Sequence, residues 1–177
     1  MTPKHLLLTG YRGCGKSAVG QLLSQLLARD LIDTDLAIES AAGKTIAEIF
    51  TELGQVGFRN LESDQIASLA SLNQPAIISL GGGAILRPEN RQRIRSLGKT
   101  VWLQATPDTI HDRVANDRST QMRRPKLSPL GDLDEIRSIL EERMPLYREV
   151  ADLTVSTDSR TMDEVASIVA DWVRTLP

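Results

Sequence analysis

The stretch GYRGCGKS, residues 10–17, follows an apolar run of leucines and contains the residue types that hold a polyphosphate. Its outer glycines, lysine and hydroxyl residue fit the pattern G-x-x-x-x-G-K-[ST]. Glycines let the backbone curl so that successive N–H groups face an anion, and the start of a helix adds positive potential. The loop therefore predicts a nucleotide site whose contacts are Gly13, Cys14, Gly15, Lys16, Ser17 and Ala18.

Two side chains of this loop would act directly on the nucleotide. Lys16 would reach the β- and γ-phosphates, and the hydroxyl of Ser17 would bind Mg²⁺. We interpret Cys14 as a small space-filling residue rather than a nucleophile, because the loop works through its backbone. The alternative is a chance match to the pattern, which a preceding strand and a following helix argue against.

Two carboxylates follow the next short apolar run. Asp33 and Asp35 come after Leu31-Ile32 at a spacing of two, so both are expected on one side of a strand's C-terminal end. Ligands of open parallel sheets gather there. One carboxylate could take the proton of an attacking hydroxyl while the other supports Mg²⁺ through water. Alternatively, Asp35 is the N-cap of the following helix.

Arg59 and Glu62 are three residues apart and are neighbours on a predicted helix. They form either a surface ion pair or a pair in which Glu62 orients Arg59 to bind a substrate carboxylate in bidentate fashion. The glycines at 81–83 end a buried strand. They make either a tight turn or a surface that a ring can approach closely.

Elements that would position these residues alternate along the chain. Helical patterns separate short apolar runs, which predicts an α/β fold with a parallel sheet and helices on both faces. A capping box of Thr45 and Glu48 opens a helix that Gly54 ends, and Thr161 with Glu164 opens the last helix. The predicted strands are 6–8, 31–32, 76–80, 100–105 and 153–155, and further helices are predicted from Pro88 to Gly98 and over 107–116 and 132–144.

Composition narrows the class of protein. The 177 residues, 41% hydrophobic and 25% charged, fit one domain over 1–177. A net charge of −2 gives no basic field for nucleic acid, and no stretch is long and apolar enough to span a bilayer. The single cysteine excludes an internal disulfide and a cysteine-built metal cluster. We expect a soluble cytoplasmic protein, and interpret His5 and His111 as ordinary surface or helix residues.

Residues 117–131, DRSTQMRRPKLSPLG, have no apolar period and contain two prolines and a glycine. This composition predicts a mobile lid. Its basic residues could suggest nucleic-acid binding, but the cluster is short and lacks aromatic residues. A loop that brings a cation to a transferring phosphoryl group accounts for them better. The basic residues are Arg118, Arg123, Arg124 and Lys126.

Several of these motifs occur together in one known family. The chain resembles the shikimate kinases from the phosphate loop nearly to its C-terminus. The resemblance implies a three-layer P-loop NTPase fold with a five-stranded parallel sheet, and ATP- and Mg²⁺-dependent phosphorylation of shikimate at its 3-hydroxyl. The matching pieces are GYRGCGKS, DTD at 33–35, GFRNLE at 57–62, GGG at 81–83, RRPKL at 123–127 and ERMPLYREVADLTV at 142–155.

The resemblance also implies roles for single residues. Asp35 would bind substrate hydroxyls and act as the base, and Asp33 would support the metal through water, with Ser79 also touching it through water. Arg124 would be the catalytic arginine of the lid, and either Arg113 or Arg118 would pack on adenine. Substrate contacts in a region of about 33–62 and beyond would be Asp35, Arg59, Gly81, Gly82, Gly83 and Arg143.

Two positions depart from the family pattern. The lid motif R-P-L-L reads Arg124-Pro125-Lys126-Leu127 here, and residues 157–160 lack the proline that often forms the second wall of the adenine site. Two other functions stay open on the sequence: a kinase for another small hydroxy acid such as gluconate, and a catalytically silent nucleotide- or shikimate-binding module. We expect a monomer whose partners are small molecules, with no nucleic acid and no membrane.

Overall fold

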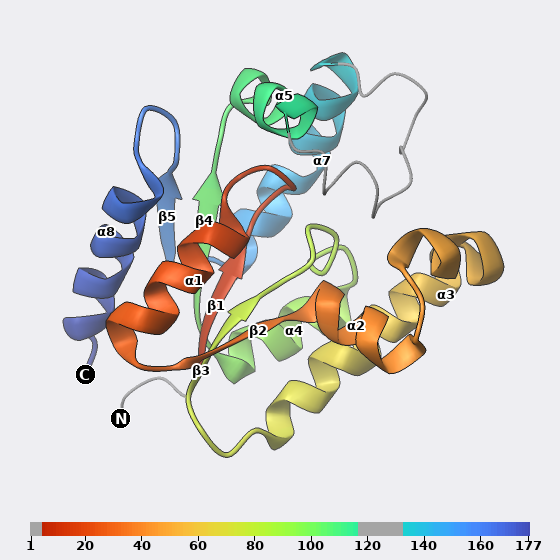
Figure 1. The fold of residues 1–177 in the computed structure, drawn as a ribbon, viewed down its shortest axis with the longest axis horizontal. Coiled ribbons are helices and arrows are strands. Elements are labelled where there is room, and N and C mark those ends of the chain that lie inside the picture. The colour runs from red at the N-terminus through yellow and green to blue at the C-terminus, as the bar shows by residue number, and fades with distance from the viewer. Residues whose placement is uncertain (1–4, 117–132) are drawn as a thin grey trace.

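The computed structural model describes residues 5–116 and 133–177, so the predicted lid, with Arg118 and Arg124, lies outside the described residues. The strands form one five-stranded sheet in the order β2-β3-β1-β4-β5 (Figure 1). Every neighbouring pair is parallel, which confirms the predicted parallel sheet. The strands are β1 (His5–Thr9), β2 (Asp30–Asp33), β3 (Ala76–Ser79), β4 (Gly98–Gln104) and β5 (Leu153–Ser156).

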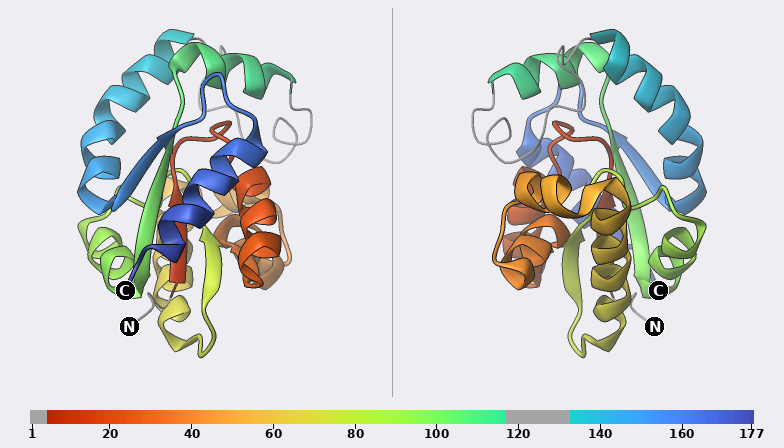
Figure 2. Two further views of the ribbon diagram at one scale, coloured as in Figure 1. Left: turned by 90° about the vertical axis from the view of Figure 1, so that its left-hand side faces the viewer. Right: turned by 90° about the vertical axis from the view of Figure 1, so that its right-hand side faces the viewer.

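Helices cover both faces of this sheet, which confirms the three-layer architecture (Figure 2). On one face lie α1 (Lys16–Leu27) and α8 (Met162–Arg174), and on the other lie α4 (Pro88–Leu97) and α7 (Leu133–Val150). No helix within the described ranges is long and apolar enough to cross a membrane. The other helices of the described residues are α2 (Thr34–Ala42), α3 (Ile46–Ser68), the short 3₁₀ helix η1 (Leu69–Ser71) and α5 (Pro107–Asn116).

The central strand β1 joins the two halves of the core. Leu6 and Leu8 pack toward α1 and α8, whereas Leu7 points to the opposite face and packs with Ile78 and Tyr147. All three leucines are buried because a central parallel strand is covered on both faces. The phosphate loop therefore starts from the most firmly packed strand of the sheet.

A third, smaller apolar cluster lies under α2 and α3. It joins Ile38, Ile46, Ile49 and Phe58, and the rings of Phe50 and Phe58 are 4.6 Å apart. Gly54, with φ of 66°, breaks α3 at the position where the sequence predicted a helix end, although a second helical stretch follows at once. Residues 33–62 thus have a local core of their own beside the sheet.

The junction of β2 and α2 differs from the prediction. Asp35 does not follow Asp33 along a strand end but lies in the first turn of α2. Asp33 is the cap, because its Oδ1 accepts hydrogen bonds from the backbone N–H groups of Asp35 at 3.0 Å and Leu36 at 3.2 Å. The alternative that Asp35 is the helix cap is therefore wrong, whereas Asp33 and Asp35 do lie together at the C-terminal end of β2 and line one pocket.

The boundaries of α7 and β4 also differ. The predicted end of the helix at 144 is wrong, because α7 continues through Pro145 to Val150. Its buried stripe continues with Tyr147 and Val150, and this packing outweighs the N–H group that proline lacks. Gly98 both ends α4 and starts β4, where it lies beside His5 of β1. His5 is fully buried in that strand rather than on the surface.

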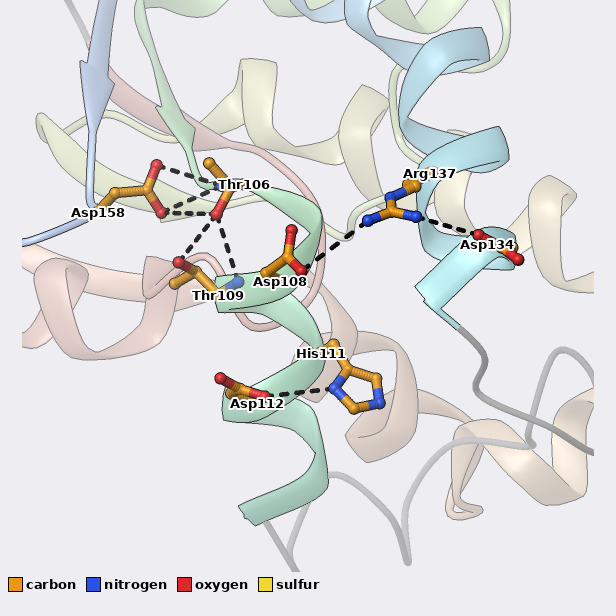
Figure 3. Close-up of polar contacts among 8 residues, drawn as sticks. All are labelled: Thr106, Asp108, Thr109, His111, Asp112, Asp134, Arg137 and Asp158. Carbon is orange, nitrogen blue, oxygen red and sulfur yellow. Dashed lines mark hydrogen bonds and ion pairs between the residues drawn. The ribbon is translucent and has the colours of Figure 1, made fainter.

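A polar network fixes the start of α5 against the end of β5 (Figure 3). The carboxylate of Asp158 accepts hydrogen bonds from the backbone N–H of Thr106 at 3.1 and 3.2 Å. Burial alone would raise the pKa of Asp158, but hydrogen bonds from Thr109, Thr106 and Ser156 outweigh it and lower that pKa. His111 lies further along α5 and is an exposed helix residue, as predicted.

Candidate functional site

One pocket lies at the C-terminal end of β1, where the loop that follows this strand meets residues of α2, β3 and α5; we call it the loop pocket. Gly10, Gly13 and Gly15 have φ values of 142°, 79° and 97°, which favour glycine strongly. A Cβ atom on Gly15 would lie only 2.6 Å from the sulfur of Met162. The lining includes Arg12, Gly13, Gly15, Lys16, Ser17, Ala18, Asp33, Asp35, Ser79 and Arg113.

Lys16 brings a cation to this pocket. It starts α1, and its ammonium donates hydrogen bonds to the carbonyl oxygens of Gly10 at 2.8 Å and Tyr11 at 3.0 Å. Ser17 follows in the first turn and is exposed. The arrangement places a positive charge, a hydroxyl and a helix N-terminus around one space, which suits a polyphosphate.

Cys14 and Arg113 were also predicted to contact the nucleotide, but only Arg113 lines the loop pocket with its side chain. The side chain of Cys14 is fully buried in the apolar core, as expected of a space-filling residue, so only its backbone belongs to the loop. Arg113 lines the loop pocket and donates to the carbonyl oxygen of Gly13 at 3.2 Å. It also donates to the hydroxyl and carbonyl oxygens of Thr157, both at 2.9 Å. These bonds hold the loop and the segment after β5 together.

A second pocket lies beside the first and brings together segments that are far apart in the sequence. We call it the arginine pocket, because guanidinium groups from α3 and α7 line it. The structure brings all the predicted substrate contacts to this one place. They are Asp35, Arg59, Gly81, Gly82, Gly83 and Arg143, and the lining also includes Tyr11, Arg12, Phe50, Phe58 and Glu62.

Arg59 and Glu62 form a buried ion pair in this pocket, with Nη1 and Oε2 2.6 Å apart. Their side chains are 15% and 1% exposed, so the alternative of a surface ion pair is wrong. Burial raises the pKa of Glu62, although the charges of Arg59, Arg143 and Arg87 oppose the shift. Glu62 thus holds the guanidinium through Nη1 and leaves the other nitrogen atoms to a ligand.

Polar side chains from α2, α3 and α7 lie close to the glycine turn after β3. A Cβ atom on Gly83 would collide with the guanidinium of Arg59, and one on Gly81 would lie 2.7 Å from Oδ1 of Asp35. The carbonyl oxygen of Gly82 accepts hydrogen bonds from the hydroxyl of Tyr147 at 2.7 Å and from Arg143 at 3.1 Å. Burial raises the pKa of Tyr147, so this hydroxyl stays a donor. The turn therefore holds Asp35, Arg59 and Arg143 close to one another.

The two pockets meet at a shared boundary. Among the described residues, Arg12, Asp35 and Ile46 are the three that line both. The sequence interpretation singled out Asp35 but not Arg12, although a cation inside a phosphate loop was a visible signal. It also passed over Tyr147, whose role depends on a contact with a turn 65 residues away.

Comparison with known proteins agrees with this arrangement. The family model described as shikimate kinase matches residues 12–174. A shikimate kinase of Rhodopirellula baltica is 47% identical over 94% of this chain and 89% of its own length. The chain belongs to the shikimate kinase family. The family's reaction is the ATP-dependent phosphorylation of shikimate.

Two further relatives of the same family support the assignment. A shikimate kinase of Symbiobacterium thermophilum is 38% identical over 94% of both chains. The structure of a shikimate kinase from Acinetobacter baumannii in complex with shikimate superimposes with a TM-score of 0.90 and 32% identity, covering 99% of this chain and 97% of that one. The shikimate kinase fold therefore extends over nearly the whole chain.

Proposed function

We propose that the loop pocket binds ATP, that the arginine pocket binds shikimate, and that the γ-phosphoryl group passes to the 3-hydroxyl of shikimate beside Asp35. The products would be shikimate 3-phosphate and ADP. The observation that carries this proposal is the shared boundary, because Asp35 lines both pockets. A carboxylate at that point is within reach of both a bound hydroxyl and a terminal phosphate.

The arginine pocket would select a carboxylic acid. Arg59 and Arg143 approach the glycine turn from α3 and α7, and both line the same cavity. A guanidinium binds a carboxylate in bidentate fashion, and Glu62 presets the orientation of Arg59. Gly81, Gly82 and Gly83 would let a ring approach the backbone. We propose residues 33–62, with their local core, as the substrate-binding region of a single kinase domain.

The donor set of the loop pocket fits Mg²⁺. Ser17 is exposed in the first turn of α1, and Asp33 and Ser79 line the same pocket. Because Oδ1 of Asp33 caps α2, this carboxylate suits a contact through water rather than a direct one. Mg²⁺ prefers oxygen ligands and keeps several waters. When bound, it would neutralise charge on the β- and γ-phosphates.

The chain's own residues would then carry the transfer. Asp35 takes the proton of the 3-hydroxyl of shikimate while the hydroxyl oxygen forms a bond to the γ-phosphorus. At the same time the bond between that phosphorus and the bridging oxygen breaks, and its electron pair leaves with ADP. Lys16 stabilises the charge on the phosphoryl oxygens. Arg124, outside the described residues, is proposed as a second catalytic cation because it matches the lid motif. Arg113 is the candidate for the adenine contact within the described residues, and Arg118 lies outside them.

Other functions fit the site less well. A kinase for an open-chain hydroxy acid such as gluconate would use the same loop pocket. The glycine turn and the converging arginines favour a compact cyclic carboxylate instead. A catalytically silent binding module would not require both a cation and a carboxylate where the phosphoryl group is transferred, yet Lys16 and Asp35 are both present at the pockets. We further propose that the protein acts as a monomer in the cytoplasm, where ATP is available.

Release of ADP on addition of shikimate tests the proposal. Purified protein with ATP and Mg²⁺ should release ADP when shikimate is added, and gluconate at the same concentration should give no more than the background. Phosphorus NMR should show one product, phosphorylated at the 3-position. Arg174→Met, a change in an exposed ion pair, is the matched control and should retain full turnover. Equal turnover of both acceptors, or none with shikimate, would overturn the proposal.

A further inference from the structure

Arg12 lies at the point where the two pockets meet, and the reaction proposed for the site gives it no role. It is the third residue of the phosphate loop, between Tyr11 and Gly13. Of the described residues that line both pockets, Asp35 carries a negative charge, Ile46 is apolar, and Arg12 carries a positive charge. The boundary thus holds one carboxylate and one guanidinium.

The surroundings of Arg12 differ from those of the other arginines in the pockets. Arg59 pairs with Glu62, and Arg143 donates to a carbonyl oxygen of the glycine turn. Arg12 is half-buried, and its Nε is buried with no hydrogen-bond partner among residues 5–116 and 133–177. Its guanidinium carbon lies 6.0 Å from the ring centroid of Tyr11. The aromatic ring flanks the cation but supplies no anion.

A buried donor on a charged group is costly to leave unpaired. Within the described ranges, no carboxylate is in ion-pair contact with Arg12. The planar fork of a guanidinium binds carboxylate or phosphate oxygens best. The carboxylate of the acceptor would already be bound by Arg59 and Arg143 beside the glycine turn. The transferred phosphoryl group, by contrast, must pass the boundary between the two pockets, where Arg12 lies.

We propose that Arg12 is a further catalytic residue, whose N–H groups bind two oxygens of the phosphoryl group during its transfer and on the phosphorylated product. The inference rests on the proposed function. Asp35 accepts the hydroxyl proton as before, and Arg12 gains and loses none. Its contribution is charge stabilisation at the moment when the oxygen–phosphorus bond to the acceptor forms and the bond to ADP breaks.

Two ligands that differ by one phosphate separate this role from simple acceptor binding. Calorimetry without nucleotide would measure the Kd of shikimate and of shikimate 3-phosphate for the wild type and for Arg12→Met. We expect the Kd of shikimate to stay within about threefold, while the product binds at least about tenfold more weakly, since only the product offers phosphate oxygens. The kcat should fall about 100-fold with the KM for ATP nearly constant, the effect of removing one preorganised donor.

A surface variant and the pattern of losses distinguish phosphoryl contact from acceptor binding. Arg174→Met should match the wild type in every measurement, since it lies on the surface of α8. Equal weakening of shikimate and its phosphate would make Arg12 an acceptor-binding residue and overturn the inference. Unchanged product affinity together with unchanged kcat would overturn it as well. If the wild type itself released no ADP with shikimate, the proposed function would fail, and the role of Arg12 with it.

A conservative variant covers the case in which Arg12→Met does not fold. Arg12→Lys keeps a positive charge but lacks the fork, so we expect weaker product binding with shikimate binding intact. Circular dichroism and Tm would show that this variant is folded. Wild-type affinity of Arg12→Lys for both ligands would overturn the two-oxygen contact.

Discussion

The loop pocket and the arginine pocket are adjacent, yet they are made in different ways. The loop pocket is built around one continuous segment, residues 12–18, whose backbone would bind the ligand, and residues of α2, β3 and α5 complete its lining. The arginine pocket combines side chains on α2, α3 and α7 with Tyr11, Arg12 and the backbone of the glycine turn. A backbone site depends on local conformation, whereas a side-chain site depends on the packing of distant segments.

Charge is also handled differently in the two pockets. Lys16 donates hydrogen bonds to carbonyl oxygens of its own loop and lines the loop pocket. In the arginine pocket, Glu62 is 1% exposed and is held by Arg59. We therefore expect changes in the loop pocket to act mainly on the rate of transfer, and changes in the arginine pocket to act mainly on affinity for the acceptor.

The largest effect is expected in the loop pocket. Lys16→Ala should lower kcat by about 10²–10³-fold, because a preorganised cation is lost where charge develops on the phosphoryl group. The protein should stay folded, since Lys16 is outside the apolar core. Steady-state kinetics with a Tm measurement checks this. Near wild-type turnover in the purified, folded variant would remove Lys16 from the catalytic residues.

A smaller effect, on affinity rather than rate, is expected from the two arginines. Arg59→Ala and Arg143→Ala should each weaken shikimate binding about 10- to 100-fold, since hydrogen bonds to charged groups contribute about 1.5–3 kcal/mol. ATP affinity should hardly change. The losses should couple in a double-mutant cycle, because both side chains would bind one carboxylate.

The Arg59→Ala and Arg143→Ala variants should differ in thermal stability. Arg59→Ala leaves the buried carboxylate of Glu62 without its cation and should lower Tm. Arg143→Ala leaves the carbonyl of Gly82 still bonded to Tyr147, so its Tm should change less. Arg59→Lys should rescue binding poorly, because a point charge lacks the fork. Unchanged acceptor affinity in either alanine variant would exclude that arginine from the substrate site.

The smallest effect is expected in stability, with opposite signs at two carboxyl groups. Burial raises the pKa of Glu62, so its charged form destabilises the fold above the unfolded pKa of about 4.3. The Tm of Glu62→Gln relative to the wild type should therefore be higher at neutral pH than at about pH 4, while shikimate binding is weakened because Arg59 loses its partner.

Asp158 is the opposite case, because its hydrogen bonds lower its pKa despite the opposing effect of burial. Its stabilising contribution is present above the unfolded pKa of about 3.9 and is lost as the pH falls through its lower folded value. Asp158→Asn should therefore lower Tm at neutral pH, and the loss should shrink toward about pH 3. Thermal denaturation of both variants across this range checks the signs. Equal shifts at every pH would show that neither effect comes from ionisation.

The sequence was most informative where the site is local. The phosphate loop, its strand and its helix form one continuous stretch, so residue types and spacing predicted the loop pocket. Strand–helix alternation predicted the sheet for the same reason. The capping boxes at Thr45 and Thr161 were also confirmed, since each needs only residues three apart.

The arginine pocket could not be predicted from local patterns. Arg143 has no neighbour in the sequence that marks it, and it entered through the family resemblance alone. The alternative that Asp35 caps α2 was wrong by two residues, because the carboxylate of Asp33 already accepts hydrogen bonds from the first N–H groups of the helix. The predicted helix end at 144 was too early, because α7 continues through Pro145 and Tyr147 packs in the core. The position of Arg12 at the boundary between the pockets depends on the packing of the glycine turn against the phosphate loop, which local sequence patterns do not reveal.

The central claim is that the two pockets exchange a phosphoryl group beside Asp35. Asp35→Asn removes the proton acceptor but keeps the shape and position of the side chain in α2. The matched variant, Asp33→Asn, changes the neighbouring carboxylate and should shift the Mg²⁺ dependence instead.

The decisive measurement is kcat at saturating ATP and shikimate, with the Kd of each ligand measured alongside. We expect Asp35→Asn to lower kcat by about 10²–10⁴-fold, the usual contribution of a general base, with ATP affinity nearly intact. An unchanged kcat in the folded Asp35→Asn variant would contradict the claim and would reduce Asp35 to a structural residue at the start of α2.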